Sequence, residues 1–171
     1  EISEGERTGC ADFVKACDLG SELGCEKYDV LCYPQTGYMP YEKYFGKGVH
    51  SGINTLYIDN TKSSTDALVV LQNINTGIKV RSQFIRQGED ITMREIPNGN
   101  YWIKQFEGNR WTYDAIMPDG VTRGGFTTNQ EIGRSNWDCP FGYECNREMT
   151  LYLVVGGTLQ TEQIDFNEFM E

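Results

Sequence analysis

The spacing of the six cysteines constrains this chain more than any other feature of its sequence. Cys10 and Cys17 are seven residues apart, and so are Cys25 and Cys32. Positions i, i+3 or i+4, and i+7 share one face of an α-helix, so each pair predicts one short helix. Gly20 lies between the two segments and punctuates them. The spacing therefore predicts a helical hairpin over residues 1–35.

Polar and turn-forming residues mark the expected ends of the two helices. Thr8 is expected to cap the first helix, and Gly20 follows its last turn. Ser21 is expected to cap the second helix, and Pro34 to close it.

The same geometry predicts how the four leading cysteines pair. Within one helix, Cys10 and Cys17 would lie ~10 Å apart at ~1.5 Å per residue, too far for a disulfide. Bridges must therefore cross the hairpin, and an antiparallel arrangement predicts Cys17–Cys25 and Cys10–Cys32. The pattern resembles twin-cysteine helical hairpins, although Gly24 near the second start departs from their usual form.

The remaining cysteines, Cys139 and Cys145, flank a Pro- and Gly-containing reversal and predict a local bridge. A zinc site is the competing interpretation, but zinc sites use C-x2-4-C pairs, which no spacing here matches. Free thiols are a third, and would need no regular spacing. An even cysteine count with regular spacing indicates disulfides and an oxidising compartment, either extracellular, periplasmic or at the cell surface. No metal or other cofactor is expected.

The charge balance disfavours two classes of partner. Fifteen Lys and Arg oppose 25 Asp and Glu, a formal net charge of -10. No basic stripe is present, so binding to nucleic acid or to an anionic membrane surface is not expected. No apolar run approaches the ~20 residues that span a bilayer, so a membrane-spanning role is not expected. The acidic start lacks the features of a signal peptide and is interpreted as a mature terminus, with the signal removed.

From residue 54 the hydrophobic pattern changes to a period of two, typical of half-buried strands. Turn signals such as Asn75-Thr76-Gly77 and Pro118-Asp119-Gly120 separate the strand segments. Short strands without long intervening helices predict a mainly β fold, an antiparallel β-sandwich of about seven strands over residues 54–171. Residues 36–53 are then a connector packed on the sandwich. The other expected strands are 67–73, 78–84, 90–96, 100–107, 121–127, 149–155 and 162–166.

The segment 88–104, Gly-Glu-Asp-Ile-Thr-Met-Arg-Glu-Ile-Pro-Asn-Gly-Asn-Tyr-Trp-Ile-Lys, resembles the signature of transthyretin-like and carboxypeptidase-regulatory-like sandwich modules. Pro97 and Gly99 would reverse the chain, so that Met93 on one strand faces Tyr101 on the next. The full arrangement, in which the block at 40–49 leads into the sandwich, also resembles that of secreted bacterial proteins. The resemblance implies a non-enzymatic binding or linking role on an exported protein.

No catalytic constellation stands out. His50 is the only histidine and has no nucleophile-elbow context around it. Carboxylates near aromatic residues, as in glycosidases, make a hydrolase the third hypothesis. These carboxylates are Asp114, Asp119, Asp138 and Glu144. The acidic end with Asp165, Glu168 and Glu171 lacks a calcium-loop pattern and is expected to be a solvated tail.

Aromatic residues in the 110–145 region give the main binding hypothesis, because that region is interpreted as long, turn-rich connections. The candidate ligand-binding residues are Trp111, Tyr113, Trp137, Phe141 and Tyr143. Exposed rings can stack on sugars or anchor a protein, whereas buried rings would plug the ends of the sandwich. A second group is expected to dock the hairpin on the sandwich: Tyr33, Tyr38, Tyr41, Tyr44 and Phe45. The leading hypothesis is a non-catalytic, secreted or cell-surface protein-interaction module, and a carbohydrate-binding module is the alternative.

Overall fold

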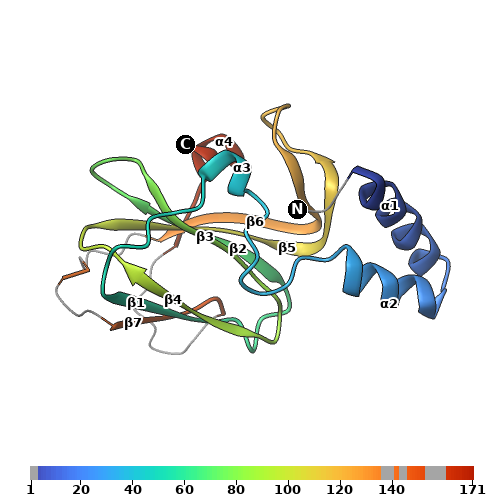
Figure 1. Cartoon of the computed structure of the whole chain (residues 1–171), viewed down its shortest axis with the longest axis horizontal. Helices are drawn as coiled ribbons and strands as arrows, with labels where there is room; N and C mark the ends of the chain where they lie inside the picture. Colours follow the sequence, from blue (N-terminus) through green and yellow to red (C-terminus); the bar gives the residue numbers. More distant parts are fainter. Residues whose placement is uncertain (1–3, 136–140, 143–145, 153–160) are drawn as a thin grey trace.

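The computed structural model describes residues 4–135, 141–142, 146–152 and 161–171, and it shows a helical hairpin beside a two-sheet body (Figure 1). The helices are α1 (Glu4–Asp18), α2 (Glu22–Leu31), α3 (Glu42–Phe45) and α4 (Phe166–Met170). The strands are β1 (Asn54–Asp59), β2 (Asp66–Asn73), β3 (Lys79–Ile85), β4 (Asp90–Ile96), β5 (Tyr101–Ile116), β6 (Arg123–Ser135), β7 (Asn146–Thr150) and β8 (Thr161–Gln163). The expected mainly β fold with an N-terminal stapled hairpin is confirmed.

The strands form two sheets, ordered β4-β1-β7 and β3-β2-β5-β6-β8. Nearly all pairs are antiparallel, as the period-two pattern predicts. The pair β1–β7 is parallel, with Thr55 opposite Asn146 and Asp59 opposite Thr150. The expectation of purely antiparallel pairing is therefore wrong for the β1–β7 pair. Parallel neighbours need a long connection, and β1 and β7 are separated by most of the body.

An aliphatic core fills the space between the two sheets. The smaller sheet contributes Leu56, Ile58 and Met93, and the larger one contributes Val69 and Ile103 among others. Alternate residues of each strand supply these side chains, because successive residues point to opposite faces of a sheet. This alternation is what made β1 recognisable in the sequence.

A second, aromatic core lies on the opposite face of the five-stranded sheet. Phe84, Phe106 and Phe126 from the sheet meet Tyr41 from the connector and Phe169 from α4. Strand β2 feeds both cores and is buried along almost its whole length. A strand covered on both faces shows a continuous apolar run, as Ala67–Leu71 does. The connector and α4 thus form a third layer on the five-stranded sheet, which a simple two-sheet sandwich lacks.

The connector between the hairpin and β1 covers the free edge of β3. Gly37 N donates to Phe84 O at 2.8 Å, and Phe84 N donates to Tyr38 O at 2.8 Å. Farther along, Val49 N donates to Val80 O at 3.0 Å. An uncovered edge strand exposes unpaired backbone groups that can pair with another chain, and the connector removes that exposure.

Strands β5 and β6 extend much farther than expected. Residues 108–116 and 128–135 continue the two strands instead of forming turn-rich connections. Register shifts interrupt the pair between Glu107 and Asn109 and again between Thr112 and Ile116. Asn129 (φ 52°), opposite the first shift, and Arg110 (φ 59°), between the two shifts, have left-handed backbone. Such bulges add a residue on one strand and let pairing resume beyond it. The sequence interpretation of this region was wrong because a bulge breaks the simple alternation.

The segment with the transthyretin-like pattern passes from one sheet to the other. Strand β4 pairs with β1 in the smaller sheet, whereas β5 pairs with β2 in the larger. Met93 and Tyr101 therefore both lie in the aliphatic core but belong to different sheets and are not neighbours within one sheet. Tyr101 Oη donates to Pro97 O at 3.0 Å and fixes the reversal between them.

The C-terminal residues form a helix, so the expected solvated tail is wrong. Asp165 caps α4 by accepting from Glu168 N at 2.8 Å. Phe166 and Phe169 are buried in the aromatic core, and Phe166 starts the helix instead of ending a strand. A helix of five residues has little intrinsic stability, so this packing and the cap must supply most of it. Short helices of this kind leave no periodic signal in a sequence.

Candidate functional site

The helical hairpin stands apart from the body (Figure 1) and carries four large apolar side chains that are each more than half exposed. Both predicted bridges are confirmed, with Cα–Cα distances of 5.5 Å for Cys10–Cys32 and 4.5 Å for Cys17–Cys25. Each bridge crosses from α1 to α2, so the two helices cannot separate. The expected bridge between Cys139 and Cys145 lies outside the described residues.

The start of α2 explains how the helices approach so closely. Ser21 is the cap, as predicted, and accepts from Gly24 N at 3.1 Å. Gly24 is buried, and a Cβ atom there would lie 2.7 Å from Ala16 Cβ. The glycine that departs from the usual hairpin pattern is therefore the contact point of the two helices. Thr8, in contrast, lies inside α1, which begins at Glu4, and is not its cap.

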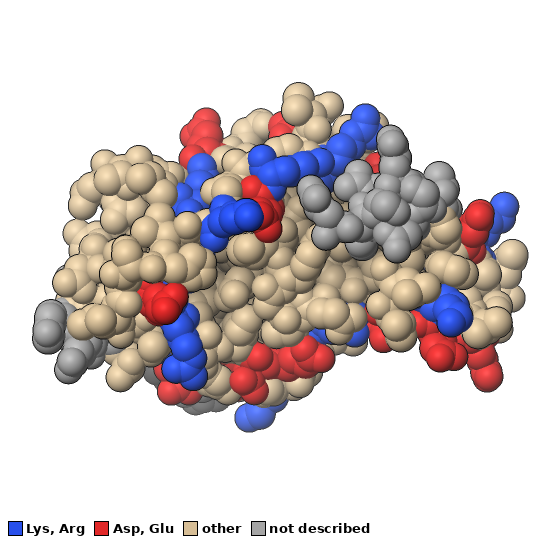
Figure 2. All heavy atoms as spheres, in the orientation of Figure 1, with Lys and Arg blue, Asp and Glu red and all other residues tan. Residues whose placement is uncertain are grey.

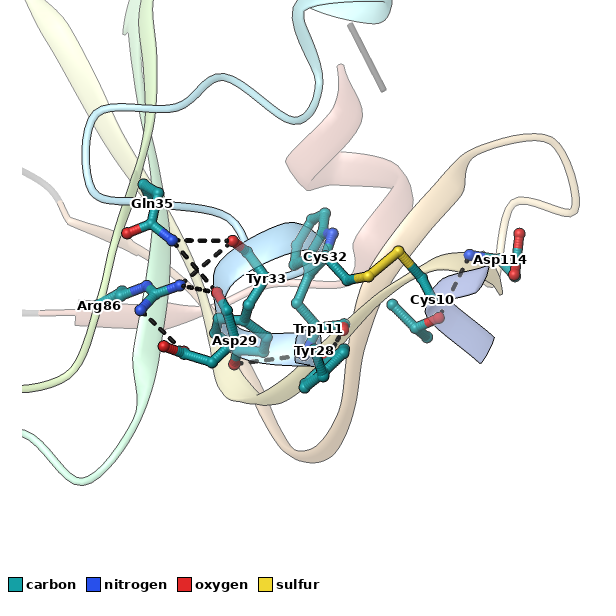
Figure 3. Close-up of a disulfide and its surroundings, with 10 residues drawn as sticks. Cys10, Tyr28, Asp29, Cys32, Tyr33, Gln35, Arg86, Trp111 and Asp114 are labelled. Carbon is teal, nitrogen blue, oxygen red and sulfur yellow. Dashed lines mark hydrogen bonds and ion pairs between the residues drawn. A yellow bond between two sulfur atoms is a disulfide. The ribbon is translucent and has the colours of Figure 1, made fainter. Parts of the chain in front are cut away.

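Two tyrosines anchor the hairpin to the body through polar contacts (Figure 3). Tyr28 Oη donates to Trp111 O, and Tyr33 Oη donates to the carboxylate of Asp66. Trp111 N in turn donates to Tyr33 Oη at 3.4 Å. Burial raises the pKa of both tyrosine hydroxyls well above the usual range, so both keep the proton they donate. Buried hydrogen bonds of this kind fix one orientation of the hairpin.

Two ion pairs at the rim add to this attachment. Arg86 pairs with Asp29 at 3.0 Å and also donates through Nε to Pro34 O at 2.9 Å. Arg110 pairs with Asp18 at the end of α1. Arg110 has left-handed backbone, so a residue at a backbone irregularity of β5 makes this contact between hairpin and body.

The face of α2 turned away from α1 carries an apolar row. Leu23, Lys27 and Val30 follow the i, i+4, i+7 spacing and therefore share one face. Leu23 is 63% exposed, Val30 64% and the adjacent Leu31 54%. Leu19, in the turn between the helices, is 81% exposed. We call Leu19, Leu23, Val30 and Leu31 the hairpin stripe. Exposed apolar side chains gathered on one element mark interaction sites more often than single exposed ones do.

An acidic row runs beside this stripe. Glu22, Glu26 and Asp29 have the same i, i+4, i+7 spacing, displaced by one residue, or about 100° around the helix. All three are exposed, and Asp29 is the one engaged by Arg86. Figure 2 shows acidic side chains gathered at the end of the molecule that α2 occupies. Residues 4–31 contain seven Asp and Glu against three Lys and Arg. The hairpin thus combines an apolar ridge with a negative one.

The predicted aromatic site is not an exposed surface. Trp111 is 0% exposed in the aromatic core, and Phe141 is 4% exposed in the aliphatic core. Tyr113 is half-buried and packs against the aromatic core, 6.4 Å from Trp111 between ring centroids. Trp137 and Tyr143 lie outside the described residues. For Trp111 and Phe141 the structure supports the alternative in which the rings fill the interior of the protein. Trp111 follows Arg110, whose left-handed backbone interrupts the regular alternation of β5.

The aromatic residues of the connector behave largely as predicted. Tyr41 is fully buried in the aromatic core, and Tyr33, Tyr44 and Phe45 pack against it. Tyr41 Oη donates to Gly124 O at 2.6 Å, and Tyr44 Oη accepts from Arg123 N at 2.8 Å. Tyr38 contributes through its backbone while its side chain stays exposed.

A polar groove of about 340 Å³ lies on the inner face of β5, β6 and β8. Glu107 and Glu131 stand directly opposite each other in it. Burial raises the pKa of Glu107 to about 7, with repulsion from Glu131 adding to it and a hydrogen bond from Thr65 opposing it. Glu107 can therefore exchange a proton near neutral pH. The described lining residues, none of them basic, are Gln105, Glu107, Glu131, Ile132, Gly133, Thr161 and Gln163.

A second pocket of about 290 Å³ lies at the end of α4. Several of the residues that line it also hold α4 in place. Lys104 Nζ donates to Glu168 O at 2.5 Å, and Lys79 Nζ donates to Glu171 O. Arg134 pairs with Glu168 at 2.5 Å. Burial lowers the pKa of Lys104 to about 8. The two lysines bind backbone carbonyls at the C-terminal end of the helix, where positive charge is favoured.

Two other residues considered for catalysis or metal binding, His50 and Asp119, have local structural partners. His50 is exposed, with Nε2 3.2 Å from Lys47 O and Nδ1 3.4 Å from Glu95. Asp119 accepts from Val121 N and Thr122 N and closes a turn. Asp114 is exposed on β5, whereas Asp138 and Glu144 lie outside the described residues. Within the described part of the chain, no three Asp, Glu, His or Cys residues are grouped as a metal site.

Sequence reasoning missed the hairpin stripe, although the signal for it was present. Once Cys25 and Cys32 are assigned to the face toward α1, Leu23 and Val30 fall on the far side of the same helix.

No helix among the described residues has the length and apolarity needed to cross a membrane. No family model, no curated protein and no solved structure matches the chain.

Proposed function

We propose that this chain is a non-catalytic protein-interaction module that acts outside the reducing cytosol and binds its partner through the hairpin stripe. The observation that carries the proposal is the exposure of Leu19, Leu23, Val30 and Leu31 on a rigid, twice-bridged hairpin. Large exposed apolar side chains are costly in water and are stabilised when a partner covers them. A prearranged surface also loses less conformational entropy on binding.

The disulfides support the assignment to an oxidising compartment, because cytosolic thiols are kept reduced. The transthyretin-like kinship stays a prediction that the two-sheet body is compatible with. A carbohydrate-binding role through Trp111 is not favoured, because a fully buried ring cannot stack on a sugar.

The proposal is tested by capture of partners from the native host with the full chain as bait. The wild-type protein is compared with Leu23→Ser/Val30→Ser and with Val121→Ser, a control at a residue that is 74% exposed on the β5–β6 turn. We expect a defined partner to be captured by the wild type and by the control but not by the double variant. Capture that is unaffected by the double variant would overturn the hairpin stripe as the binding site.

A further inference from the structure

The two rows of side chains on α2 specify more than an apolar partner. We infer that the partner of the hairpin stripe is a basic amphipathic helix, which lays its apolar face along Leu23 and Val30 and its cationic side chains along Glu22 and Glu26. This inference rests on the proposed function and names the chemistry of the partner at that same surface.

The first support is the geometry of the row. Leu23 and Val30 are seven residues apart, two helical turns, and rise about 10.5 Å along the axis. Leu31 widens the ridge at its far end, and Leu19 extends it beyond the start of α2. A straight ridge of this length matches the i, i+3, i+4, i+7 anchors of a helix that packs alongside. A flat sheet or a single inserted loop would leave part of it uncovered.

The second support is charge complementarity. Glu22 and Glu26 are exposed beside Leu23, and no ion pair within the described residues engages either carboxylate. Asp29 continues this row and is shared with Arg86. Opposite charges across an interface speed association and fix the register of the partner. Lys and Arg on the flank of an incoming helix would meet this acidic row along its length.

A third feature constrains the register further. Lys27 is exposed in the middle of the apolar row, between Leu23 and Val30. Its aliphatic stem can lie along a partner while its ammonium group reaches the edge. The facing position of the partner must therefore be polar or acidic. A partner helix with uniform positive charge at that position would be disfavoured by like-charge contact.

The test uses the full, disulfide-bonded chain and three labelled peptides of about 18 residues with the same helical design. The first has leucines on one face and lysines on its flank, the second has glutamate in place of every lysine, and the third keeps the lysines but has glutamine in place of leucine. Binding is followed by fluorescence anisotropy at low and at physiological salt. Backbone amide NMR shifts locate the binding surface.

We expect the lysine–leucine peptide to bind at least about tenfold more tightly than either other peptide, because each lacks one of the two complementary features. Leu23→Ser/Val30→Ser should weaken its binding about tenfold or more, with amide shifts centred on α2. Glu22→Gln/Glu26→Gln should weaken it about three- to tenfold at low salt and less at high salt. Val121→Ser should leave it unchanged.

Equal binding of the lysine and glutamate peptides would overturn the inference, as would binding that Glu22→Gln/Glu26→Gln leaves unchanged at low salt. The two proposals fail separately. A captured native partner that depends on Leu23 and Val30 but has no basic helix would refute this inference and keep the proposed function. Loss of both peptide binding and stripe-dependent capture would refute both.

Discussion

The body of this protein buries most of its described large apolar side chains in two cores, whereas the hairpin leaves four leucine and valine side chains largely open to water. The body depends on packing between layers, and nothing covalent holds its described strands together. The hairpin depends on two disulfides, one close contact at Gly24 and a small set of polar anchors. Covalent bridges can hold a shape whose apolar surface stays free, while a packed core cannot. The difference indicates that the hairpin is built to present a surface.

The sharpest way to break this comparison is to remove a large side chain from the aromatic core. Trp111→Ala should lower the free energy of unfolding by about 3–5 kcal/mol, because it deletes a fully buried ring and leaves a cavity. Chemical denaturation followed by circular dichroism would measure it. Val121→Ala, at an exposed site, should change stability by less than about 0.5 kcal/mol. Similar effects for both would show that the aromatic core is not closely packed.

Removal of the disulfides tests the other side of the comparison. In the loop-entropy model, Cys10→Ser/Cys32→Ser should destabilise the hairpin by about 3 kcal/mol and Cys17→Ser/Cys25→Ser by about 2.5 kcal/mol, because the first bridge closes the longer loop. Hydrogen exchange should accelerate in α1 and α2 while β2 and β5 stay protected. An equal loss of protection in β2 would mean that the hairpin and the body unfold as one unit.

Glu107 sharpens the comparison, because its effect belongs to the body alone. Its pKa is raised from 4.5 to about 7 by burial, so the folded state holds the proton more tightly than the unfolded chain. This contribution is fully present below pH 4.5 and is lost as pH rises through 7, for a change of about 1–3 kcal/mol. Glu107→Gln should flatten that part of the stability profile. A profile unchanged by the substitution would show that Glu107 is well solvated in the groove.

The smallest effects are expected at two helix caps, one on each side of the comparison. Ser21→Ala removes the cap of α2, and Asp165→Ala removes the cap of α4. Each should cost about 1 kcal/mol. The loss at Asp165 should lower the melting temperature of the body, whereas the loss at Ser21 should be seen only as faster hydrogen exchange in the hairpin. An equal fall in melting temperature for Ser21→Ala would show that the hairpin and the body unfold together.

The parts of the fold that follow local rules were predictable from the sequence. The rise of an α-helix excludes a bridge from Cys10 to Cys17, so both hairpin disulfides followed from spacing alone. Alternating residues identified β1 because it has one buried face. The period of two also identified β3, although both of its faces are buried. These signals need no knowledge of the partner strand.

The parts that depend on distant contacts were not predictable. The bulge between Glu107 and Asn109 and the left-handed backbone of Arg110 arise where β5 pairs with β6, and Trp111, expected at an exposed site, lies in the aromatic core just after them. Helix α4 is set by the burial of Phe166 and Phe169 against a sheet face formed by earlier strands. The hairpin stripe became clear only when the inner face of α2 was known.

The anchoring of the hairpin has a consequence for redesign. Tyr28 Oη and Tyr33 Oη bind the carbonyl and amide of residue 111, groups that every non-proline residue carries. The contacts at residue 111 therefore do not depend on its side chain, and none of the anchoring contacts described above involves Leu19, Leu23, Val30 or Leu31. The hairpin stripe can therefore be changed to bind a new target while the tyrosine contacts and both disulfides are kept. The hairpin is thus a suitable scaffold onto which a different binding surface could be grafted.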